Sequence, residues 1–336
     1  MDLTTRYLGL TLPHPFMPGA SPMVDDLDLV RRLEDAGAAA IVMHSLFEEQ
    51  ITREEVGTIR QMEIISGSYP EALTYFPEPE AFLLGPEKYL EQVRRLKLAV
   101  RIPVIASLNG ATPGGWVSFA TRIAEAGADA LELNLYDLGA HDGEPGFSLE
   151  RRFLEIVRSV KAAVRIPVAV KLSPFFSSLG SFAAELDGMS VDGLVLFNRF
   201  YQPDIDPETL DVTPVLRLST HDELLLRLRW LAMLSGRVKA SLAVTGGVHD
   251  ALDAIKAIMA GADVVQMVSA LLLRGPKALA EVRADVTRFL EEHEYESLAQ
   301  MKGSMSLRSC PDPAAYERAN YARVLQSYKL TEPAAI

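Results

Sequence analysis

One short pattern occurs three times along this chain, and each copy joins an amphipathic segment to an apolar run. The copies span residues 36–43, 126–133 and 260–267, and each has Gly as its second residue. Gly suits the position after a helix because it takes a left-handed conformation without strain, and a continuous apolar run fits a strand buried on both faces. Repetition of this unit predicts a parallel α/β barrel.

Composition narrows the class of protein and of partner. The net charge of −12 over 336 residues argues against a partner bound through polymer phosphates, so we expect no nucleic acid. A single cysteine, Cys310, excludes a disulfide framework and a four-thiolate iron–sulfur cluster within the chain. No basic and apolar leader opens the sequence, and no apolar run reaches the ~20 residues of a membrane span, so we expect a cytoplasmic protein away from membranes.

Apolar runs and helical patterns alternate eight times, which predicts one TIM (β/α)8 barrel over residues 1–310 and a C-terminal helical appendage over 311–336. The predicted strands are 16–19, 39–44, 103–108, 130–135, 168–172, 193–197, 241–244 and 264–268. The predicted helices are 26–36, 86–100, 117–126, 149–164, 182–187, 222–235, 251–260 and 276–292. Long insertions follow strands two and six, at 45–85 and 198–221, and we expect them to form walls of the active site.

Polar side chains stand at the carboxyl ends of four predicted strands. Lys171 ends an apolar run, where an ammonium is costly to desolvate unless an anion or several acceptors meet it. Asn109, Asn134 and Asn198 lie at or just after three other strand ends, so the four should converge on one mouth. Their donors suit a planar heterocycle with carbonyl edges, although a single Asn there is more often an ordinary strand-end hydrogen-bonding residue.

A second group of residues is suited to phosphate. Gly246 and Gly247 lead from strand seven into a helix, so bare backbone N–H groups face outward, and Ser269 follows strand eight at the matching place. Phosphate sites after strands seven and eight recur in this architecture. A tight turn would explain the two glycines but not the serine.

These segments together resemble the class 1 dihydroorotate dehydrogenases. The likeness runs in order from about residue 3 to 307, and the segments that carry it are 15–21, 131–135, 170–174, 245–248 and 266–269. The resemblance implies an FMN-containing barrel that oxidises dihydroorotate, a small molecule, to orotate in pyrimidine biosynthesis. It also implies a homodimer, and an electron-transfer partner protein would be needed for a nicotinamide route, since no separate dinucleotide fingerprint is present.

The resemblance also assigns individual residues. Asn134 and Asn198 would contact the substrate, and the Lys171 cation would stabilise the reduced flavin. The positions implied to bind the cofactor are Ala20, Ser21, His44, Ser45, Asn109, Asn134 and Lys171 around the flavin, and Gly246, Gly247 and Ser269 at its phosphate.

The chain departs from the family pattern at three places. Asp137 stands where the family has its Cys base, and a carboxylate (pKa ~3.9, against ~8.5 for a thiol) needs desolvation to become a comparable base, so Asp137 is either that base or a loop cap. His44 replaces a flavin-contacting lysine. Segment 73–78 replaces the substrate-binding loop, so the expected substrate is dihydroorotate or a related cyclic amide, and Arg199 could meet its carboxylate.

Three functions are compatible with these residues. The first is an FMN-dependent dehydrogenase acting on a CH–CH bond, with Asp137 and Lys171 in catalytic roles. The second is an aldolase or lyase in which Lys171 forms a Schiff base with a phosphorylated substrate. The third is a flavin subunit that transfers electrons within a complex without dehydrogenating a substrate. We favour the first, and no metal site is predicted.

Overall fold

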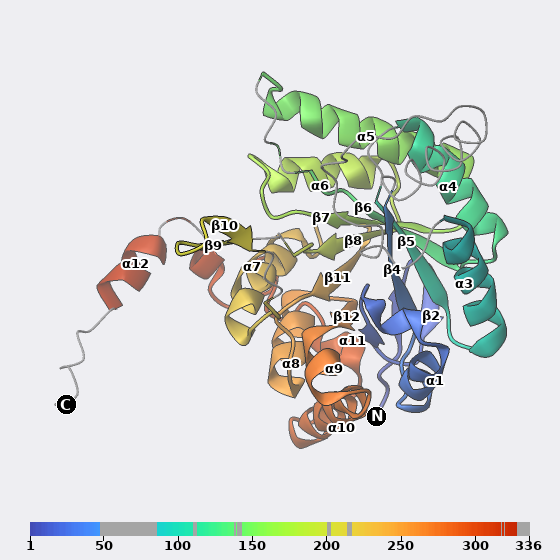
Figure 1. The fold of residues 1–336 in the computed structure, drawn as a ribbon. Coiled ribbons are helices and arrows are strands. Elements are labelled where there is room, and N and C mark those ends of the chain that lie inside the picture. Colours follow the sequence, from blue (N-terminus) through green and yellow to red (C-terminus); the bar gives the residue numbers. More distant parts are fainter. Residues whose placement is uncertain are drawn as a thin grey trace, which may run out of the picture.

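The computed structural model describes residues 1–47, 86–109, 113–137, 139, 143–199, 203–213, 217–316, 318 and 320–327. Eight parallel strands form one curved sheet in the order β3-β12-β11-β8-β7-β6-β5-β4 (Figure 1). Ala39 N donates to Phe16 O (2.9 Å), which brings the two ends of the sheet together, so the barrel is nearly closed. The strands are β3 (Phe16–Pro18), β4 (Ile41–Phe47), β5 (Val104–Asn109), β6 (Ala130–Asn134), β7 (Val168–Leu172), β8 (Gly193–Leu196), β11 (Ser241–Thr245) and β12 (Val264–Met267).

Helices cover the outside of the barrel and alternate with its strands, which confirms the predicted TIM barrel. The main ones are α1 (Leu27–Asp35), α3 (Pro86–Ala99), α4 (Pro113–Glu125), α5 (Gly146–Ala163), α6 (Leu179–Gly188), α7 (Leu224–Leu234), α8 (Ala251–Ala260) and α10 (Lys277–Glu292). Short helices add to these: η1 (Pro22–Asp25), η3 (His221–Glu223), α9 (Ser269–Arg274), α11 (Leu298–Met301) and η4 (Pro313–Tyr316). Each predicted barrel strand and helix corresponds to one of these elements, with ends shifted by a few residues.

Two hairpins are present that the sequence patterns did not predict. In the first, β1 (Thr5–Tyr7) pairs with β2 (Leu10–Leu12), and its Tyr7 and Leu8 pack in the same buried cluster as residues of the barrel strands. This hairpin fills the amino-terminal end of the barrel. The second, β9 (Asp204–Asp206) with β10 (Asp211–Thr213), lies in the insertion after β8. Strands of three residues are too short to show a clear alternation of polar and apolar side chains.

The repeated pattern of the sequence has a physical basis in the structure. Its glycines, Gly37, Gly127 and Gly261, all have positive φ (89°, 97° and 122°), as expected for residues that end a helix. In two copies of the pattern an Asp stands two residues after the glycine. Asp129 accepts from Val104 N (2.7 Å), and Asp263 accepts from Leu242 N (2.8 Å). The repeat therefore ends a helix, ties the incoming strand to its neighbour and starts the next strand.

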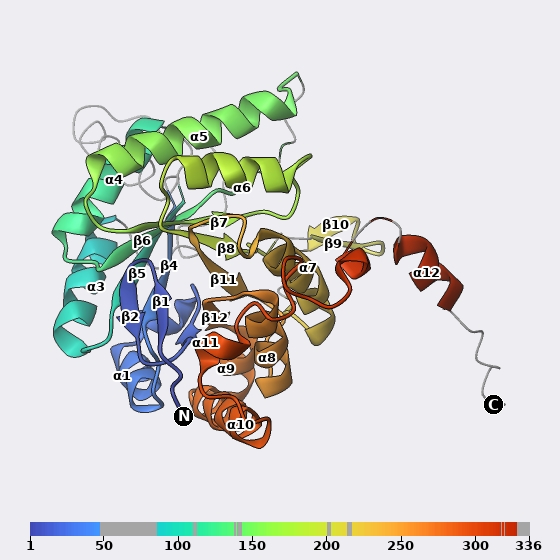
Figure 2. The ribbon, with the colours of Figure 1, turned by 180° about the vertical axis from the view of Figure 1, so that it is seen from behind.

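The C-terminal helix α12 (Asn320–Ser327) lies beyond the barrel, on the same side of the molecule as β9 and β10 in both views (Figures 1 and 2). Tyr316 donates to Met305 O (2.6 Å) shortly before this helix. The division of the chain at residue 310 stays a prediction. Among the described residues, none of the helices has both the length and the apolar character needed to cross a bilayer.

His14, just before β3, gives the fold a testable pH dependence. Burial, with a smaller effect of the nearby Arg283, lowers the pKa of its imidazole from 6.5 to about 4. The unfolded chain therefore binds a proton at His14 more readily than the folded chain does. The contribution of the neutral His14 imidazole to the free energy of unfolding is present above pH 6.5 and is lost as pH falls toward 4. Denaturant unfolding at a series of pH values should show that His14→Gln loses less stability over this range than the wild type. Equal losses in the two proteins would contradict the prediction.

Candidate active site

Polar side chains fill the part of the barrel interior that is nearest to the carboxyl ends of the strands. At its amino-terminal end the interior contains apolar side chains such as Ala130, Ala169 and Val195. Because successive side chains of a strand alternate between faces, the residues two and four positions further along point to the same interior. These inward positions carry buried polar side chains toward the carboxyl ends of the strands: Ser107, Asn109, Glu132, Asn134, Lys171, Thr245 and Gln266.

Three of the predicted site residues form one hydrogen-bonded chain at this mouth. Asn198 Nδ2 donates to Asn134 Oδ1 (2.9 Å), and Asn134 Nδ2 lies 3.5 Å from Ser45 Oγ. Ser45 Oγ is in turn 2.8 Å from Ser107 Oγ. The partners come from β4, β5, β6 and the end of β8, so the barrel brings together residues that are far apart in the sequence. Their amide orientations are fixed by one another.

Lys171 lies beside an acidic residue that the sequence reasoning missed. Its Nζ is 3.5 Å from Glu132 Oε1, and the Glu132 side chain is 0% exposed. Gln266 Nε2 donates to Glu132 Oε2 (3.1 Å) from the opposite part of the barrel wall. The signal was present in the sequence, because Glu132 is a charged residue inside an apolar run.

The predicted phosphate group is also brought together. Gly246 and Gly247 have φ of 84° and 86°, where glycine is favoured. Ser219 connects this turn to Ser269: its Oγ accepts from Gly247 N (3.1 Å) and lies 2.8 Å from Ser269 Oγ. Arg227, a buried residue of α7, donates from Nε to Thr245 O (2.6 Å) and supports the turn from behind. Ser219 and Arg227 were not among the predicted site residues.

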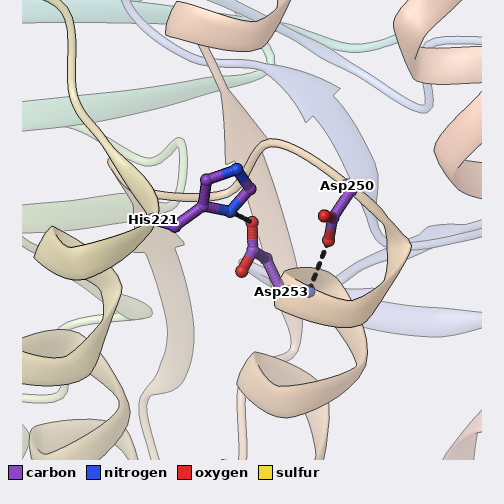
Figure 3. Close-up of side chains that lie close together, drawn as sticks. All are labelled: His221, Asp250 and Asp253. Carbon is purple, nitrogen blue, oxygen red and sulfur yellow. Dashed lines mark hydrogen bonds and ion pairs between the residues drawn. The ribbon is translucent and has the colours of Figure 1, made fainter. Parts of the chain in front are cut away.

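Ser219 belongs to the segment 217–223, here called the strap, which forms hydrogen bonds with residues at the start of α8. His249 Nε2 lies 2.6 Å from Ser219 O, and His221 Nδ1 lies 2.6 Å from Asp253 Oδ2 (Figure 3). His221, Asp250 and Asp253 place their ligand-type atoms within 4.8 Å of one another. Asp250 caps α8 by accepting from Asp253 N (3.0 Å), so hydrogen bonds to the protein already account for these carboxylates.

The predicted flavin contacts at the start of the barrel differ in their surroundings. Ser21 is buried, and within the described residues its Oγ has no hydrogen-bond partner, while Ala20 beside it is half-buried. His44 Nδ1 lies 2.9 Å from Asp25 Oδ1, and its ring meets Tyr89 edge-on. Burial raises the pKa of Tyr89, whose hydroxyl donates to Ser107 O (2.9 Å).

Asp137 and Arg199 each have an ionic partner. Asp137 Oδ1 accepts from Gly139 N (2.8 Å), and its Oδ2 accepts from Arg152 Nη2 (2.9 Å). Arg199 Nη2 lies 3.7 Å from Glu223 Oε1 in the strap. The segment 73–78, predicted from the resemblance to stand in place of the family's substrate-binding loop, lies outside the described residues.

Known proteins with similar sequences place the chain in a family. The sequence pattern of the dihydroorotate dehydrogenase family matches residues 84–290. The dihydroorotate dehydrogenase B (NAD(+)) catalytic subunit of Thermoplasma volcanium is 27% identical over 312 residues, which cover 90% of this chain and 98% of that protein. Subunits of the same name from Pyrococcus abyssi and Methanothermobacter thermautotrophicus are 26% and 24% identical, over 90% of this chain and 98% and 97% of their own.

A barrel with polar side chains gathered at the carboxyl ends of its strands has the architecture of (β/α)8 enzymes, whose active sites lie at that end. The family pattern covers more than half of the sequence, and the chain belongs to the dihydroorotate dehydrogenase family. It is an oxidoreductase of the dihydroorotate dehydrogenase type at the level of that family. This confirms the predicted family, fold and enzyme class, and it favours the dehydrogenase hypothesis over the aldolase.

Proposed function

We propose that this chain binds FMN across the mouth of the barrel and oxidises dihydroorotate or a related cyclic amide. The observation that carries the proposal is the convergence of Lys171, Asn134 and Asn198 at the carboxyl ends of three strands. FMN, when bound, would supply a two-electron acceptor. The residues proposed to hold its ring are Ala20, Ser21, His44, Ser45, Asn109, Asn134 and Lys171.

Three features of the structure fit this cofactor. Ser21 Oγ is a buried hydroxyl without a hydrogen-bond partner in the described part of the chain, which is costly unless a ligand satisfies it. Lys171 is 7% exposed and has three donor hydrogens to satisfy at the edge of the mouth. In the turn after β11, Ser219 Oγ accepts from Gly247 N (3.1 Å) and lies 2.8 Å from Ser269 Oγ, so a phosphate oxygen that took the place of this hydroxyl would meet both donors.

The substrate is proposed to lie against the paired amides of Asn134 and Asn198. Two amides linked by a 2.9 Å hydrogen bond present fixed donors and acceptors, which suits a cyclic amide with N–H and C=O groups on one edge. Arg199 is proposed to meet a substrate carboxylate, for which it would exchange its 3.7 Å contact with Glu223.

Electron transfer to another protein is part of the proposal. The relatives are named as catalytic subunits of dihydroorotate dehydrogenase B (NAD(+)), a name that implies a second subunit in those enzymes. We propose a corresponding electron-transfer partner for this chain. A homodimer, expected from the resemblance, stays a prediction.

Anaerobic mixing of the purified, yellow protein with dihydroorotate tests the proposed function. Bleaching of the flavin absorbance within the mixing experiment is the expected result. A colourless protein that takes up no added FMN would contradict the cofactor assignment. A yellow protein whose colour neither dihydroorotate nor related cyclic amides change would favour the electron-transferring flavin subunit instead.

The contacts of Asp137 favour the role of a loop cap over that of a catalytic base. Both carboxylate oxygens are engaged, one by Gly139 N and the other by Arg152. Loss of a general base costs a rate factor of about 10²–10⁴. Asp137→Asn keeps an acceptor for Gly139 N. We therefore expect its flavin to be reduced at a rate no more than about tenfold below that of the wild type, a smaller loss than the removal of a general base would cause. Single-turnover rates measure this, and a drop of about 1000-fold would make Asp137 the base.

A further inference from the structure

Glu132 is a fully buried carboxylate in the middle of β6, and the proposed function gives it no role. It points into the barrel, as does Ala130 two residues before it. In the register of β6 and β7, Glu132 is opposite Ala169, whereas Asn134 is opposite Lys171. The backbone of Lys171 therefore lies two residues nearer to the mouth than that of Glu132. The Lys171 ammonium is 3.5 Å from Glu132 Oε1.

The described residues give this carboxylate little hydrogen bonding. Oε2 accepts one bond, from Gln266 Nε2 (3.1 Å), and Oε1 is a buried oxygen without a hydrogen bond in the described part of the chain. A carboxylate removed from water needs several hydrogen bonds or an opposite charge. The Lys171 cation supplies that charge, so the two residues depend on each other.

We propose that Glu132 is a positioning residue that sets the charge of the cofactor site through Lys171. The inference rests on the proposed FMN-dependent function. Two-electron reduction places negative charge on the flavin, and a lysine near its ring stabilises that charge. A carboxylate 3.5 Å from the same ammonium holds that ammonium beside β6 and so limits its approach to the flavin ring, which weakens this effect. Glu132 thus keeps the reduction potential of bound FMN lower than Lys171 alone would make it, and it fixes where the ammonium lies.

A role confined to supporting the barrel makes a different prediction. It would change stability when Glu132 is replaced and leave the potential of any FMN that remains bound unaltered. The potential of the loaded protein therefore separates the two roles, and the affinity for FMN is measured alongside it.

The experiment compares wild type and Glu132→Gln, loaded with FMN, in a reductive titration with dithionite against a reference dye. Gln has the same shape and keeps an acceptor for Gln266, but it removes the charge. In E132Q we expect the ratio of the affinities for reduced and oxidised FMN to be about tenfold higher than in the wild type. This change equals a rise of about 30 mV in the reduction potential of a two-electron couple. Glu132→Asp, which keeps the charge, should return the binding ratio to within about threefold of wild type.

Asp192→Asn is the matched control, because Asp192 pairs with Lys161 (2.7 Å) before β8, at the other end of the barrel. It also removes one negative charge, and it should leave the potential unchanged. An E132Q protein that binds FMN with the wild-type potential would overturn the proposal while leaving the proposed function intact. A wild type that binds no FMN would contradict the proposed function itself.

The Lys171→Met background keeps the test decisive if E132Q does not fold. Removing both partners leaves no unpaired charge in the barrel, so K171M/E132Q should fold at least as well as K171M. If Glu132 acts through Lys171, the two proteins should have the same potential. A difference of about 30 mV between them would show that Glu132 acts on the flavin directly and would overturn the proposal.

Discussion

Lys171→Met is expected to lower the free energy of unfolding by about 3–5 kcal/mol, because it leaves the buried Glu132 carboxylate without its opposite charge. It should also slow flavin reduction by about 100- to 1000-fold, the usual cost of losing one preorganised group that stabilises developing charge. Urea unfolding of the protein measures the first effect. Anaerobic single-turnover reduction of the FMN-loaded variant measures the second.

Lys161→Met is the matched control for the loss of stability. Lys161 also pairs with one carboxylate, Asp192, but its side chain is 24% exposed rather than buried in the barrel. A partly exposed ion pair contributes about 0–1 kcal/mol, so K161M should cost little and leave flavin reduction unchanged. If K171M is no less stable than K161M, the mutual dependence of Lys171 and Glu132 is wrong.

The barrel could be predicted because its signals are local. The run 260–267 alone ends a helix, places a glycine with positive φ and starts a strand, and a few such units determine the architecture. The short hairpins escaped prediction for the opposite reason. In β9 and β10 the one apolar residue of each strand, Ile205 or Val212, is exposed, and three residues are too few to mark a strand.

The candidate site could be predicted as a set of strand-end residues, but not as a network. Asn134 meets Asn198 across 64 residues of sequence, and Ser219 meets Ser269 across 50. Such pairs depend on which strands are neighbours and on how the strap folds, and one sequence shows neither. Glu132 illustrates the limit, because its burial was visible in the apolar run while its partner depended on the register of β6 and β7.

Gly247→Ala should weaken FMN binding by about 100-fold or more, which corresponds to about 3 kcal/mol. The residue has φ of 86°, and a Cβ added there would lie 2.6 Å from Leu224 N and 3.0 Å from Leu224 Cα. These are backbone atoms at the start of α7, so the turn has to move as a unit. That movement displaces the N–H groups proposed to bind the phosphate, and charge-assisted hydrogen bonds are each worth about 1.5–3 kcal/mol.

Gly275→Ala separates this effect from backbone strain. Gly275 has a similar φ of 76°, it follows α9, and a Cβ added there meets nothing within 4 Å. Both variants carry the cost of a left-handed alanine, about 1–2 kcal/mol of stability, but only G247A disturbs the proposed phosphate site. Fluorescence titration with FMN should therefore give G275A an affinity close to wild type. If the two variants bind FMN equally well, the phosphate does not rest on Gly247, and the turn after β11 serves the fold alone.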